Sequence, residues 1–405
     1  MKARGPSPKT LCLPAGFTFS AACAGIKASG RPDLALVEAC PGTTAAAMFT
    51  KNRVVAAPLE VGRAALAATR GRVRAVIVNS GNANCATGRA GIQACQEVCR
   101  SLAQLLGLRA HEIFPSSTGI IGVPLPVGKI LTKLPELMAA RKATKHGVAD
   151  FARAIMTTDT RPKLASATFH AGKSAVNLLG IAKGAGMIHP DLATMLVYLF
   201  TDLAASPAEL KRCLQEICDQ TFNCISIDGD TSTNDTVLLL ASGRSGVPWK
   251  RPLARQKFSR ALLQVCQSLA EQIISDGEGV EHVIRLSVEN AKNREEARQV
   301  ARTVAHSLLV KTAWAGADPN WGRILAAAGR SGALLDPGKV SVRIGDQLVC
   351  RAGVGCPYDR KRAHRALAQP QCKISISLGR GRASIQFLTT DLTAEYVRIN
   401  ADYST

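Results

Sequence analysis

The stretch KGAGMIHPDLATMLVYLFTD, residues 183–202, constrains the fold more than any other part of the chain. Small and turn-forming residues extend to Ala193, and Thr194 is followed by an almost unbroken apolar run from Met195 to Phe200. A short apolar run bounded by turn residues is typical of a strand that is buried on both faces. The simplest explanation for a threonine at its start is strand propensity, because β-branched residues are common in strands.

Thr194 also has a chemical explanation. If the chain is cut before this residue, its hydroxyl group and its new α-amine form a nucleophile and base within one residue. The α-amine has an ordinary pKa of roughly 7.7–8.0, which suits a base at neutral pH. The hydroxyl can make the cut itself by attacking the carbonyl carbon of Ala193, and Gly184 and Gly186 would let the backbone bend for that attack.

Length and composition indicate a globular protein. The 405 residues are too many for one simple core and suggest two domains or one composite domain. Hydrophobic residues make up 46% and charged residues 20%, no apolar run has the roughly 18 residues of a membrane helix, and no signal peptide is evident. We therefore expect a soluble, cytoplasmic protein. The 13 scattered cysteines include no C-x-x-C pair, so neither a disulfide framework nor a metal site is expected.

The net charge of +21 raises the question of a nucleic-acid partner. The basic residues are spread along the chain, and aromatic residues make up only 4%, which leaves little material for stacking on bases. We therefore expect no nucleic-acid partner and no membrane. The charge is compatible with a solvated basic surface or with a field that attracts small anionic substrates.

Strand and helix patterns alternate along the chain without a repeating unit. Strand patterns occupy residues 34–60, and two hairpins are expected in KVSVRIGDQLVC and CKISISLGRGRASIQF. Helical patterns occupy residues 89–106, 127–141, 146–156, 251–274 and 294–310, and SPAELKRCLQEICDQTF has a serine N-cap followed by proline. The sequence therefore predicts a mixed α/β protein with layered sheets and helices.

A series of ordered motifs covers nearly the whole chain, from about Pro14 to Thr405. In chain order they are AAPLEV, VNSGNAN, PSSTGIIG, IMTTDT, KGAGMIHPDLATML, SIDGDTSTND, KTAWAGADPNWGRILAAAG and EYVRINADYST. The series resembles the ornithine acetyltransferase family, also called glutamate N-acetyltransferase (ArgJ type). The resemblance implies a layered αββα-like sandwich, outwardly like the N-terminal-nucleophile hydrolases, with a smaller α/β part at roughly residues 285–395.

The resemblance implies that the chain cleaves itself between Ala193 and Thr194. The products are an α chain, residues 1–193, and a β chain, residues 194–405, which fold together as one composite unit. Thr194 is then the nucleophile that takes acetyl from N2-acetyl-L-ornithine and passes it to L-glutamate, in the cyclic pathway of arginine biosynthesis. One covalent nucleophile can serve both half-reactions.

Further site residues are implied by the same resemblance. Thr118 and Gly119 match the oxyanion hole, where a hydroxyl and a backbone N–H can face developing negative charge. Substrate-binding positions are matched by Thr157 or Thr158, Lys183, Thr194, Glu278, Asn400 and Thr405. A lysine and a glutamate suit a substrate with a carboxylate and a side-chain amine, and the motif does not decide between the two neighbouring threonines.

The resemblance also sets expectations about cofactors, assembly and rivals. No bound cofactor and no metal are expected, and acetyl-CoA is a co-substrate of the bifunctional members, which share these motifs with the monofunctional ones. The expected assembly is a heterotetramer of two α and two β chains. The alternative enzyme is a β-peptidyl aminopeptidase-like hydrolase with an N-terminal nucleophile, and the non-enzymatic alternative is a basic nucleic-acid-binding protein.

Overall fold

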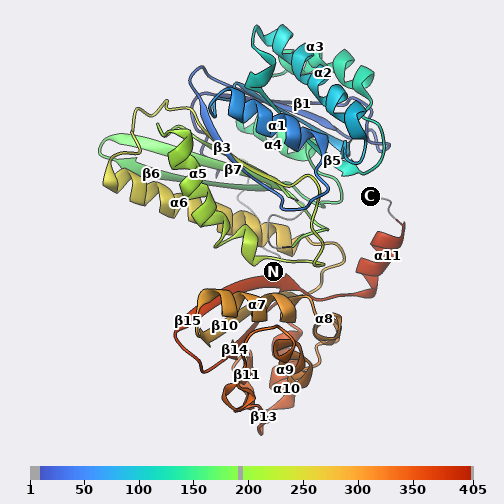
Figure 1. Cartoon of the computed structure of the whole chain (residues 1–405), viewed down its shortest axis with the longest axis vertical. Coiled ribbons are helices and arrows are strands. Elements are labelled where there is room, and N and C mark those ends of the chain that lie inside the picture. Colours follow the sequence, from blue (N-terminus) through green and yellow to red (C-terminus); the bar gives the residue numbers. More distant parts are fainter. Residues whose placement is uncertain (1–9, 190–194, 403–405) are drawn as a thin grey trace. The chain divides into compact units, whose positions relative to one another are not determined.

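The computed structural model describes residues 10–189 and 195–402 of the chain (Figure 1). The chain divides into two compact units. Among the described residues, the larger unit contains 10–189, 195–223 and 230–273, and the smaller unit contains 224–229 and 274–402. Each unit has its own sheet structure and core.

The larger unit contains a four-stranded and a five-stranded sheet. The first has the order β1-β2-β4-β5, with β4 and β5 parallel and the other pairs antiparallel: β1 (Phe17–Ala22), β2 (Leu34–Ala39), β4 (Ala75–Asn82) and β5 (Ile113–Ile120). The second has the order β3-β9-β8-β7-β6, with β8 and β9 parallel: β3 (Thr44–Phe49), β9 (Thr236–Ala241), β8 (Leu196–Thr201), β7 (Ser174–Lys183) and β6 (Lys163–Ala171).

These two sheets pack face to face, and alternation along the strands separates their inner and outer faces. In β2, Ala35 and Val37 join the core between the sheets, whereas Leu34 and Leu36 face a second core on the outer side. Tyr198 and Phe200 of β8 belong to the same inner core as Val37. In β8, all six residues are buried, as the apolar run after Thr194 predicted.

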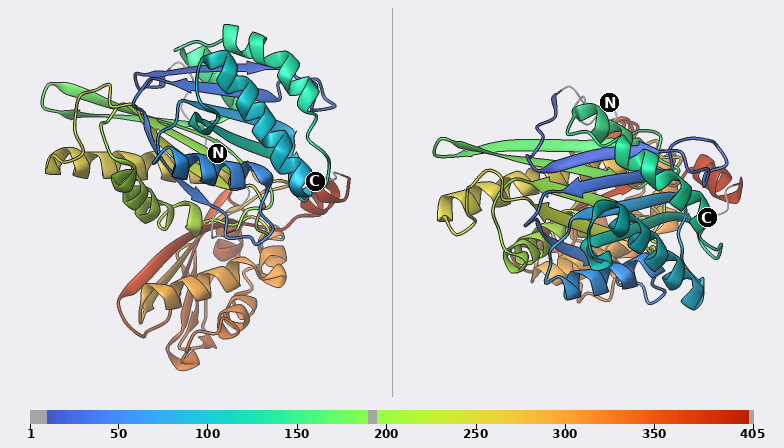
Figure 2. Two further views of the ribbon diagram at one scale, coloured as in Figure 1. Left: turned by 45° about the horizontal axis from the view of Figure 1, so that its top comes forward. Right: turned by 90° about the horizontal axis from the view of Figure 1, so that it is seen from above.

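Helices cover both outer faces, which gives four layers (Figures 1 and 2). The outer core of the first sheet contains residues of α2 (Gly88–Leu106) and α3 (Val127–Ala139), and α1 (Ala57–Ala68) packs on β5. On the second sheet, α5 (Pro207–Cys218) packs on β3, and α6 (Pro252–Ser275) lies so close to β7 that a Cβ at Gly180 would be 2.7 Å from Val265 and Leu269. Helix α4 (Lys145–Ala154) contributes Phe151 to the core between the sheets. The predicted αββα-like arrangement is confirmed.

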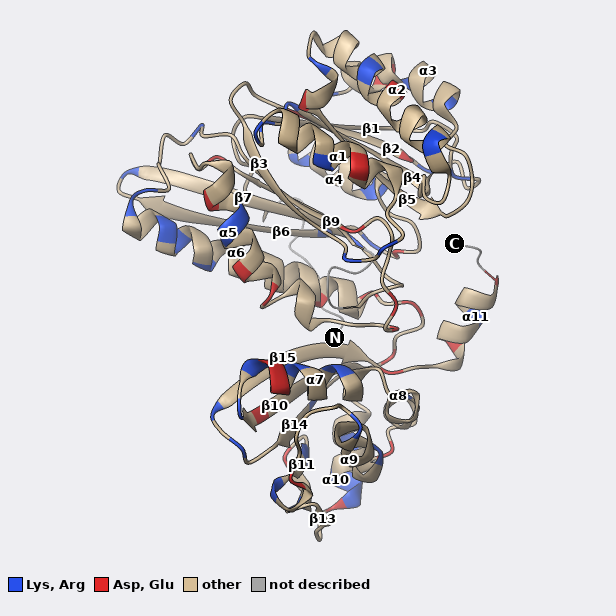
Figure 3. Ribbon diagram, in the orientation of Figure 1, with Lys and Arg blue, Asp and Glu red and all other residues tan. Residues whose placement is uncertain are grey.

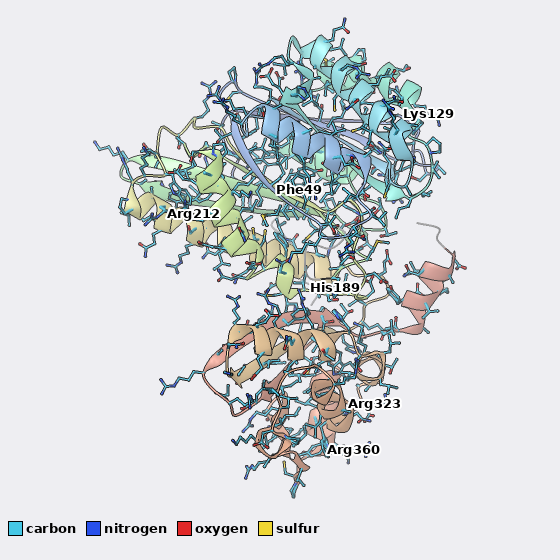
Figure 4. The ribbon with its side chains drawn as sticks, viewed as in Figure 1. Phe49, Lys129, His189, Arg212, Arg323 and Arg360 are labelled. Atoms are coloured by element: carbon cyan, nitrogen blue, oxygen red, sulfur yellow. The ribbon has the colours of Figure 1, made fainter. Side chains whose placement is uncertain are left out.

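The smaller unit is a two-layer α/β structure around one six-stranded sheet. The strand order is β13-β12-β11-β14-β10-β15: β13 (Val354–Gly355), β12 (Gln347–Arg351), β11 (Ser341–Ile344), β14 (Gln371–Ser377), β10 (Val283–Ala291) and β15 (Ala383–Thr390). Ile284, Leu286 and Val288 of β10 share a core with the helices that follow. Those helices are α7 (Arg294–Ala305), α8 (Leu308–Ala315), α9 (Trp321–Gly329) and α10 (Arg360–Leu367), and α11 (Ala394–Asp402) ends the described chain. In Figure 4, Arg323 lies on α9, and its guanidinium donates to the carbonyl oxygen of Leu309 at 2.8 Å.

Three of the predicted elements differ from the structure. The strand region predicted over residues 34–60 ends too late, because α1 begins at Ala57 with Pro58 in its first turn. The helix predicted over 294–310 is two helices, α7 and α8, since Ser307 has extended backbone angles between them. The second predicted hairpin is also wrong, because β14 and β15 both pair with β10, which lies between them. Alternation assigns a strand's faces, but it does not choose the strand's partner.

The remaining predicted elements are confirmed in place. Helices α2, α3, α4 and α6 lie within a few residues of their predicted ranges, and α5 begins after Ser206, whose side chain accepts a hydrogen bond from the Glu209 N–H. Strands β11 and β12 form the first predicted hairpin. No helix in the described ranges is long and apolar enough to cross a membrane. Lysine and arginine residues occur on the elements of both units (Figure 3).

Candidate active site

A buried lysine of one sheet contacts a threonine of the other sheet inside the larger unit. Lys183 is the last residue of β7 and Thr118 lies near the end of β5, and both side chains are almost fully buried. Lys183 Nζ donates to Thr118 Oγ1 at 3.3 Å. A threonine hydroxyl that accepts from an ammonium group can still donate its own proton to a third group. In the antiparallel register, Lys183 pairs with Leu196, so this contact lies at the start of β8.

Asp159 ties together two of the predicted substrate-binding segments. Its Oδ1 accepts from Lys163 Nζ at 2.5 Å and from the Gly184 N–H at 2.7 Å, and its Oδ2 accepts from the Thr157 N–H at 3.1 Å. The side chains of Asp159 and Lys163 are 0% exposed. One carboxylate therefore positions the residue after Lys183 and the backbone of Thr157 together.

The charges around Asp159 keep it ionised despite its burial. Burial alone would raise the pKa of its carboxyl group, but the positive charges of Lys163 and Lys183 and the hydrogen bonds to the carboxylate outweigh it and hold this pKa well below its usual range. Lys27 is a further cation in this neighbourhood. Burial lowers the pKa of Lys27 to about 8, although Asp33 partly opposes the shift, and the charge of Lys183 lowers it further. The interior of the site therefore holds buried groups of both charges close together.

Gly119 is required by its backbone conformation and by the space around it. Its φ is +132°, which side chains rarely adopt, and a Cβ there would lie 2.3 Å from the carbonyl carbon of Gly81 and 2.5 Å from the nitrogen of Asn82. These are backbone atoms of the neighbouring strand β4, so a side chain cannot be accommodated by a rotamer change. A glycine at 119 keeps β4 and β5 in contact next to Thr118.

We expect Gly119→Ala to lower the free energy of unfolding of the protein by about 3 kcal/mol or more, since it adds both backbone strain and a steric clash. Gly122→Ala is the matched control, because Gly122 has φ +83° but a Cβ added to it would meet no atom within 4 Å. That variant should lose only about 1 kcal/mol from strain. Thermal unfolding of both variants measures the difference, and equal losses would show that the contact with Gly81 is unimportant.

Met195, the first described residue after the gap, is held by a buried acid. Its backbone N–H donates to Asp235 Oδ1 at 2.9 Å, and its carbonyl oxygen accepts from the Thr236 N–H at 3.1 Å. Asn234 precedes Asp235 in the loop before β9. Its side-chain amide donates to the carbonyl oxygens of Ser117 at 2.9 Å and Ala83 at 2.7 Å. The start of β8 is therefore fixed to the loop before β9, and that loop is fixed to the end of β5.

In the smaller unit, two predicted site residues lie together. Asn400 Nδ2 donates to Glu278 Oε2 at 3.0 Å and to the Tyr396 carbonyl oxygen at 3.0 Å. The loop that carries Glu278 packs closely on helix α11, because a Cβ at Gly279 would be 2.3 Å from the Tyr396 nitrogen. Thr393 Oγ1 also donates to the Gly279 carbonyl oxygen at 2.6 Å. Helix α11 is thus docked on the Glu278 loop.

A buried lysine contacts the segment that leads into α11. Lys311 is 2% exposed, and its ammonium group donates to the carbonyl and hydroxyl oxygens of Thr390. Burial lowers its pKa to about 8, against the opposing charges of Asp391 and Asp228. Its backbone carbonyl oxygen accepts from the Leu392 N–H at 3.3 Å. Lys311 therefore anchors the segment between β15 and α11.

Glu281, His282 and Asp391 bring three metal-ligand atoms within 4.8 Å of one another. Both Asp391 oxygens are already engaged, however. Oδ2 contacts His282 Nδ1 at 2.8 Å and accepts from the His282 N–H at 3.0 Å, and Oδ1 accepts from the Glu281 N–H at 3.3 Å. This arrangement is that of a carboxylate that stabilises a turn and orients a histidine ring.

The predicted site residues fall into three groups. Thr118, Gly119, Thr157, Thr158 and Lys183 belong to the larger unit, where Lys183 contacts Thr118 and Asp159 links the segments of Lys183 and Thr157. Glu278 and Asn400 belong to the smaller unit and are hydrogen-bonded. Ala193, Thr194 and Thr405 lie outside the described residues.

Sequence reasoning missed the buried charged residues that hold the site together. They are Asp159, Lys163, Asp235 and Lys311. Asp159, Asp235 and Lys311 lie in quoted motifs, and Lys163 follows one of them by three residues. For Lys163 and Asp235 the available signal was a charged residue at the start of an apolar strand, as in Lys163 before LASATF, whereas Lys311 lies within helix α8 and had no such signal. A charged residue at the end of a strand, within or near a polar motif, indicates a buried ion pair, because charged side chains are rarely buried unless they are paired.

The fold and the site define the class of the protein as a four-layer α/β protein with a buried polar site, in which a lysine of one sheet contacts a threonine hydroxyl of the other. The chain belongs to the ArgJ family, whose model matches residues 18–405.

Two related proteins align with nearly the full length of this chain. The arginine biosynthesis bifunctional protein ArgJ of Methylococcus capsulatus is 44% identical over 99% of this chain and 98% of that protein. The protein of the same name in Bradyrhizobium diazoefficiens is 42% identical over 98% of each chain. A crystal structure of the arginine biosynthesis bifunctional protein ArgJ from Bacillus halodurans is 38% identical, with a TM-score of 0.49, and covers 51% of this chain and 98% of that one.

Proposed function

We propose that this protein is a self-processing acetyltransferase of arginine biosynthesis that moves acetyl from N2-acetyl-L-ornithine to L-glutamate. The observation that carries the proposal is the match to the ArgJ family over residues 18–405, together with relatives that are named as arginine biosynthesis bifunctional proteins. The contact between Lys183 and Thr118 at the start of β8 supports it, since this contact adjoins the strand that follows Thr194.

The maturation step starts with Thr194 Oγ attacking the carbonyl carbon of Ala193. The peptide nitrogen leaves as the amine of Thr194, which creates an ester between the two residues. Water hydrolyses this ester, so that Ala193 ends the α chain, residues 1–193, with a carboxylate and Thr194 begins the β chain, residues 194–405, with an α-amine. The hydroxyl is free again after hydrolysis.

The transfer reaction uses the same hydroxyl twice. The α-amine of Thr194 takes the hydroxyl proton while Oγ attacks the acetyl carbonyl carbon of N-acetylornithine. The negative charge on the carbonyl oxygen is stabilised by the Gly119 N–H and the Thr118 hydroxyl. Ornithine leaves with the proton on its amine. The amine of glutamate then attacks the acetyl-threonine ester and regenerates Thr194.

The remaining site residues bind the substrates in this proposal. Lys183 binds a substrate carboxylate, and its buried position beside Thr118 supports this role, because an ammonium group attracts anions strongly where water is excluded. Glu278 and Asn400, which are hydrogen-bonded, bind the amine end of ornithine. Thr157 or Thr158 and the C-terminal Thr405 complete the set, with Asp159 holding the backbone of Thr157.

We further propose that acetyl-CoA is an alternative acetyl donor, as expected of a bifunctional member, and that the enzyme needs no bound cofactor or metal. The proposed assembly is a heterotetramer of two α and two β chains in the cytoplasm. The word bifunctional in the names of the two relatives supports the second donor.

The test is an acetyl-transfer assay on the purified protein with glutamate as the acceptor. N-acetylornithine and acetyl-CoA are supplied as donors in separate reactions, and N-acetylglutamate is measured. The proposal predicts transfer from N-acetylornithine. Hydrolysis of a β-peptide amide without any transfer to glutamate would instead assign the protein as a β-peptidyl aminopeptidase-like hydrolase.

A further inference from the structure

Lys27 is a half-buried cation near the candidate site, and the proposed mechanism gives it no role. It lies in the loop between β1 and β2, and its Nζ donates to the Pro32 carbonyl oxygen at 2.8 Å and to the Ala154 carbonyl oxygen at 3.1 Å. Its backbone N–H donates to Oδ2 of the buried Asp33 at 3.0 Å. An ammonium group that donates to carbonyl oxygens of two separate segments holds those segments together.

The stem of Lys27 packs on the strand beside the predicted oxyanion hole. A Cβ at Gly81 of β4 would be 3.0 Å from Lys27 Cγ and 3.4 Å from the Lys27 backbone nitrogen. Gly81 pairs with Gly119 of β5, and a Cβ at Gly119 would be 2.3 Å from the Gly81 carbonyl carbon. Lys27 therefore covers Gly81, and Gly81 in turn contacts Gly119.

The contact with Ala154 links Lys27 to the segment of Thr157. Ala154 is the last residue of α4, and its carbonyl oxygen also accepts from the hydroxyl of Ser80 in β4. Thr157 follows three residues later, and its N–H donates to Asp159. Lys27 therefore connects β4 with the segment that carries a proposed substrate-binding residue.

The charges around Lys27 come from several elements. Arg31 and Asp33 lie in the same loop, Asp159 follows α4, and Lys183 ends β7. The charged side chains near the end of α4, which pair with each other, are Asp150 and Arg153. Burial lowers the pKa of Lys27 to about 8. The two acids Asp33 and Asp159 oppose this shift, and the two cations add to it. Lys27 is therefore charged at neutral pH and loses its proton as the pH rises through about 8.

We infer that Lys27, in its charged form, is a positioning residue for the oxyanion hole and for the segment of Thr157; this inference rests on the proposed function. As an ammonium group it donates charge-assisted hydrogen bonds to two carbonyl oxygens, which keep its stem over Gly81 and Gly81 against Gly119. As a neutral amine it makes weaker hydrogen bonds and loses its attraction to the nearby acids. The oxyanion donors then lose part of their alignment, and a misplacement of about 1 Å can cost about 10²-fold in rate.

The kinetics of acetyl transfer over pH in Lys27→Met and Lys27→Arg test the inference. Methionine keeps most of the stem but has no charge and no donor, so kcat at pH 7 should fall about 10²-fold with KM changed less than about threefold. The wild-type kcat should decline above a pH of about 8 as Lys27 loses its proton. Arginine stays charged, so Lys27→Arg should keep kcat within about tenfold and move that decline to higher pH by about one unit or more.

Lys129→Met is the matched control, because Lys129 donates to the same loop. It is exposed on α3 (Figure 4), and its Nζ donates to the Gly25 carbonyl oxygen at 2.8 Å. Its substitution removes one cation and one hydrogen bond to the loop but leaves the contacts of Lys27 with Gly81 and Ala154 in place. This variant should keep the wild-type kcat and the wild-type decline of kcat at high pH.

Amide hydrogen exchange tests the positioning of the two segments without using activity. In Lys27→Met, residues 116–122 and residues 154–159 should exchange at least about tenfold faster than in the wild type. Lys129→Met should leave both rates unchanged. If the Lys27 variants do not fold, exchange in the wild type at pH 7 and pH 9, corrected for intrinsic exchange, makes the same test, because both segments should lose protection at the higher pH.

Unchanged protection of both segments in Lys27→Met, or in the wild type between pH 7 and pH 9, would overturn the inference even if activity fell. A decline of kcat at high pH that Lys27→Arg does not move would also overturn it. A wild-type protein that shows the expected exchange but transfers no acetyl to glutamate would instead contradict the proposed function.

Discussion

Thr194→Ala leaves the protein as one intact polypeptide of 42.7 kDa and reduces acetyl transfer by more than about 10⁴-fold. The alanine methyl group cannot attack the carbonyl carbon of Ala193, so no ester forms and no new α-amine appears. The same substitution removes the group that would carry the acetyl. The mass of the denatured protein, measured on freshly purified samples, distinguishes one chain from two fragments that meet between Ala193 and Thr194.

Thr201→Ala is a matched control for this experiment, because Thr201 is a buried threonine at the other end of β8. Its hydroxyl donates to the Asn177 carbonyl oxygen at 2.9 Å, so its loss should cost some stability but leave cleavage intact. A wild-type protein that stays in one piece at its working temperature would mean that the maturation chemistry is missing. Cleavage of Thr194→Ala at the same bond would assign the cut to another residue or to a protease.

Loss of the contact between Lys183 and Thr118 should have the second largest effect. Lys183→Met removes a buried positive charge, and Thr118→Val removes the hydroxyl that accepts its hydrogen bond at 3.3 Å. We expect each substitution to lower kcat/KM for acetyl transfer by about 10²–10³-fold, since each removes a charged or polar partner of the reacting groups. Steady-state kinetics of the two single variants and the double variant measure these losses.

The double variant tests whether the two side chains act as one unit. Residues that share an interaction give non-additive losses of kcat/KM. The kcat/KM of the double variant should therefore be no more than about tenfold below that of the less active single variant. A double variant whose loss is the full product of the single losses would contradict the coupling. Melting temperatures of all three variants separate loss of function from loss of the folded state.

The sequence was most informative where a pattern is local. Periodicity placed α2, α3, α4 and α6, and the Ser206 cap with Pro207 placed the start of α5, because helix signals depend on neighbours within a few residues. The partner of β15 was assigned incorrectly. Its alternation is the same whether it pairs with β14 or with β10, and β10 comes about ninety residues earlier in the chain.

In the candidate site, too, the sequence was informative about individual residues but not about long-range contacts. A family resemblance of the motifs identified Thr118, Lys183 and Glu278, but the motifs carry no information about the contacts that hold these residues. Asp159 meets Gly184 across 25 positions of sequence, and Asp235 meets Met195 across 40. Such contacts depend on how the sheets stack, and only the folded structure brings these groups within hydrogen-bond distance.

The most direct test of the central claim is a trapped acetyl-enzyme. The wild-type protein is incubated with N-acetylornithine in the absence of glutamate, quenched in acid and analysed by mass spectrometry of its denatured chains. We predict one added acetyl group on the β chain, located on Thr194 by fragmentation and removed when glutamate is supplied before the quench. Acetyl transfer to glutamate without any acetylated β chain, or with the acetyl group on another residue, would contradict the account.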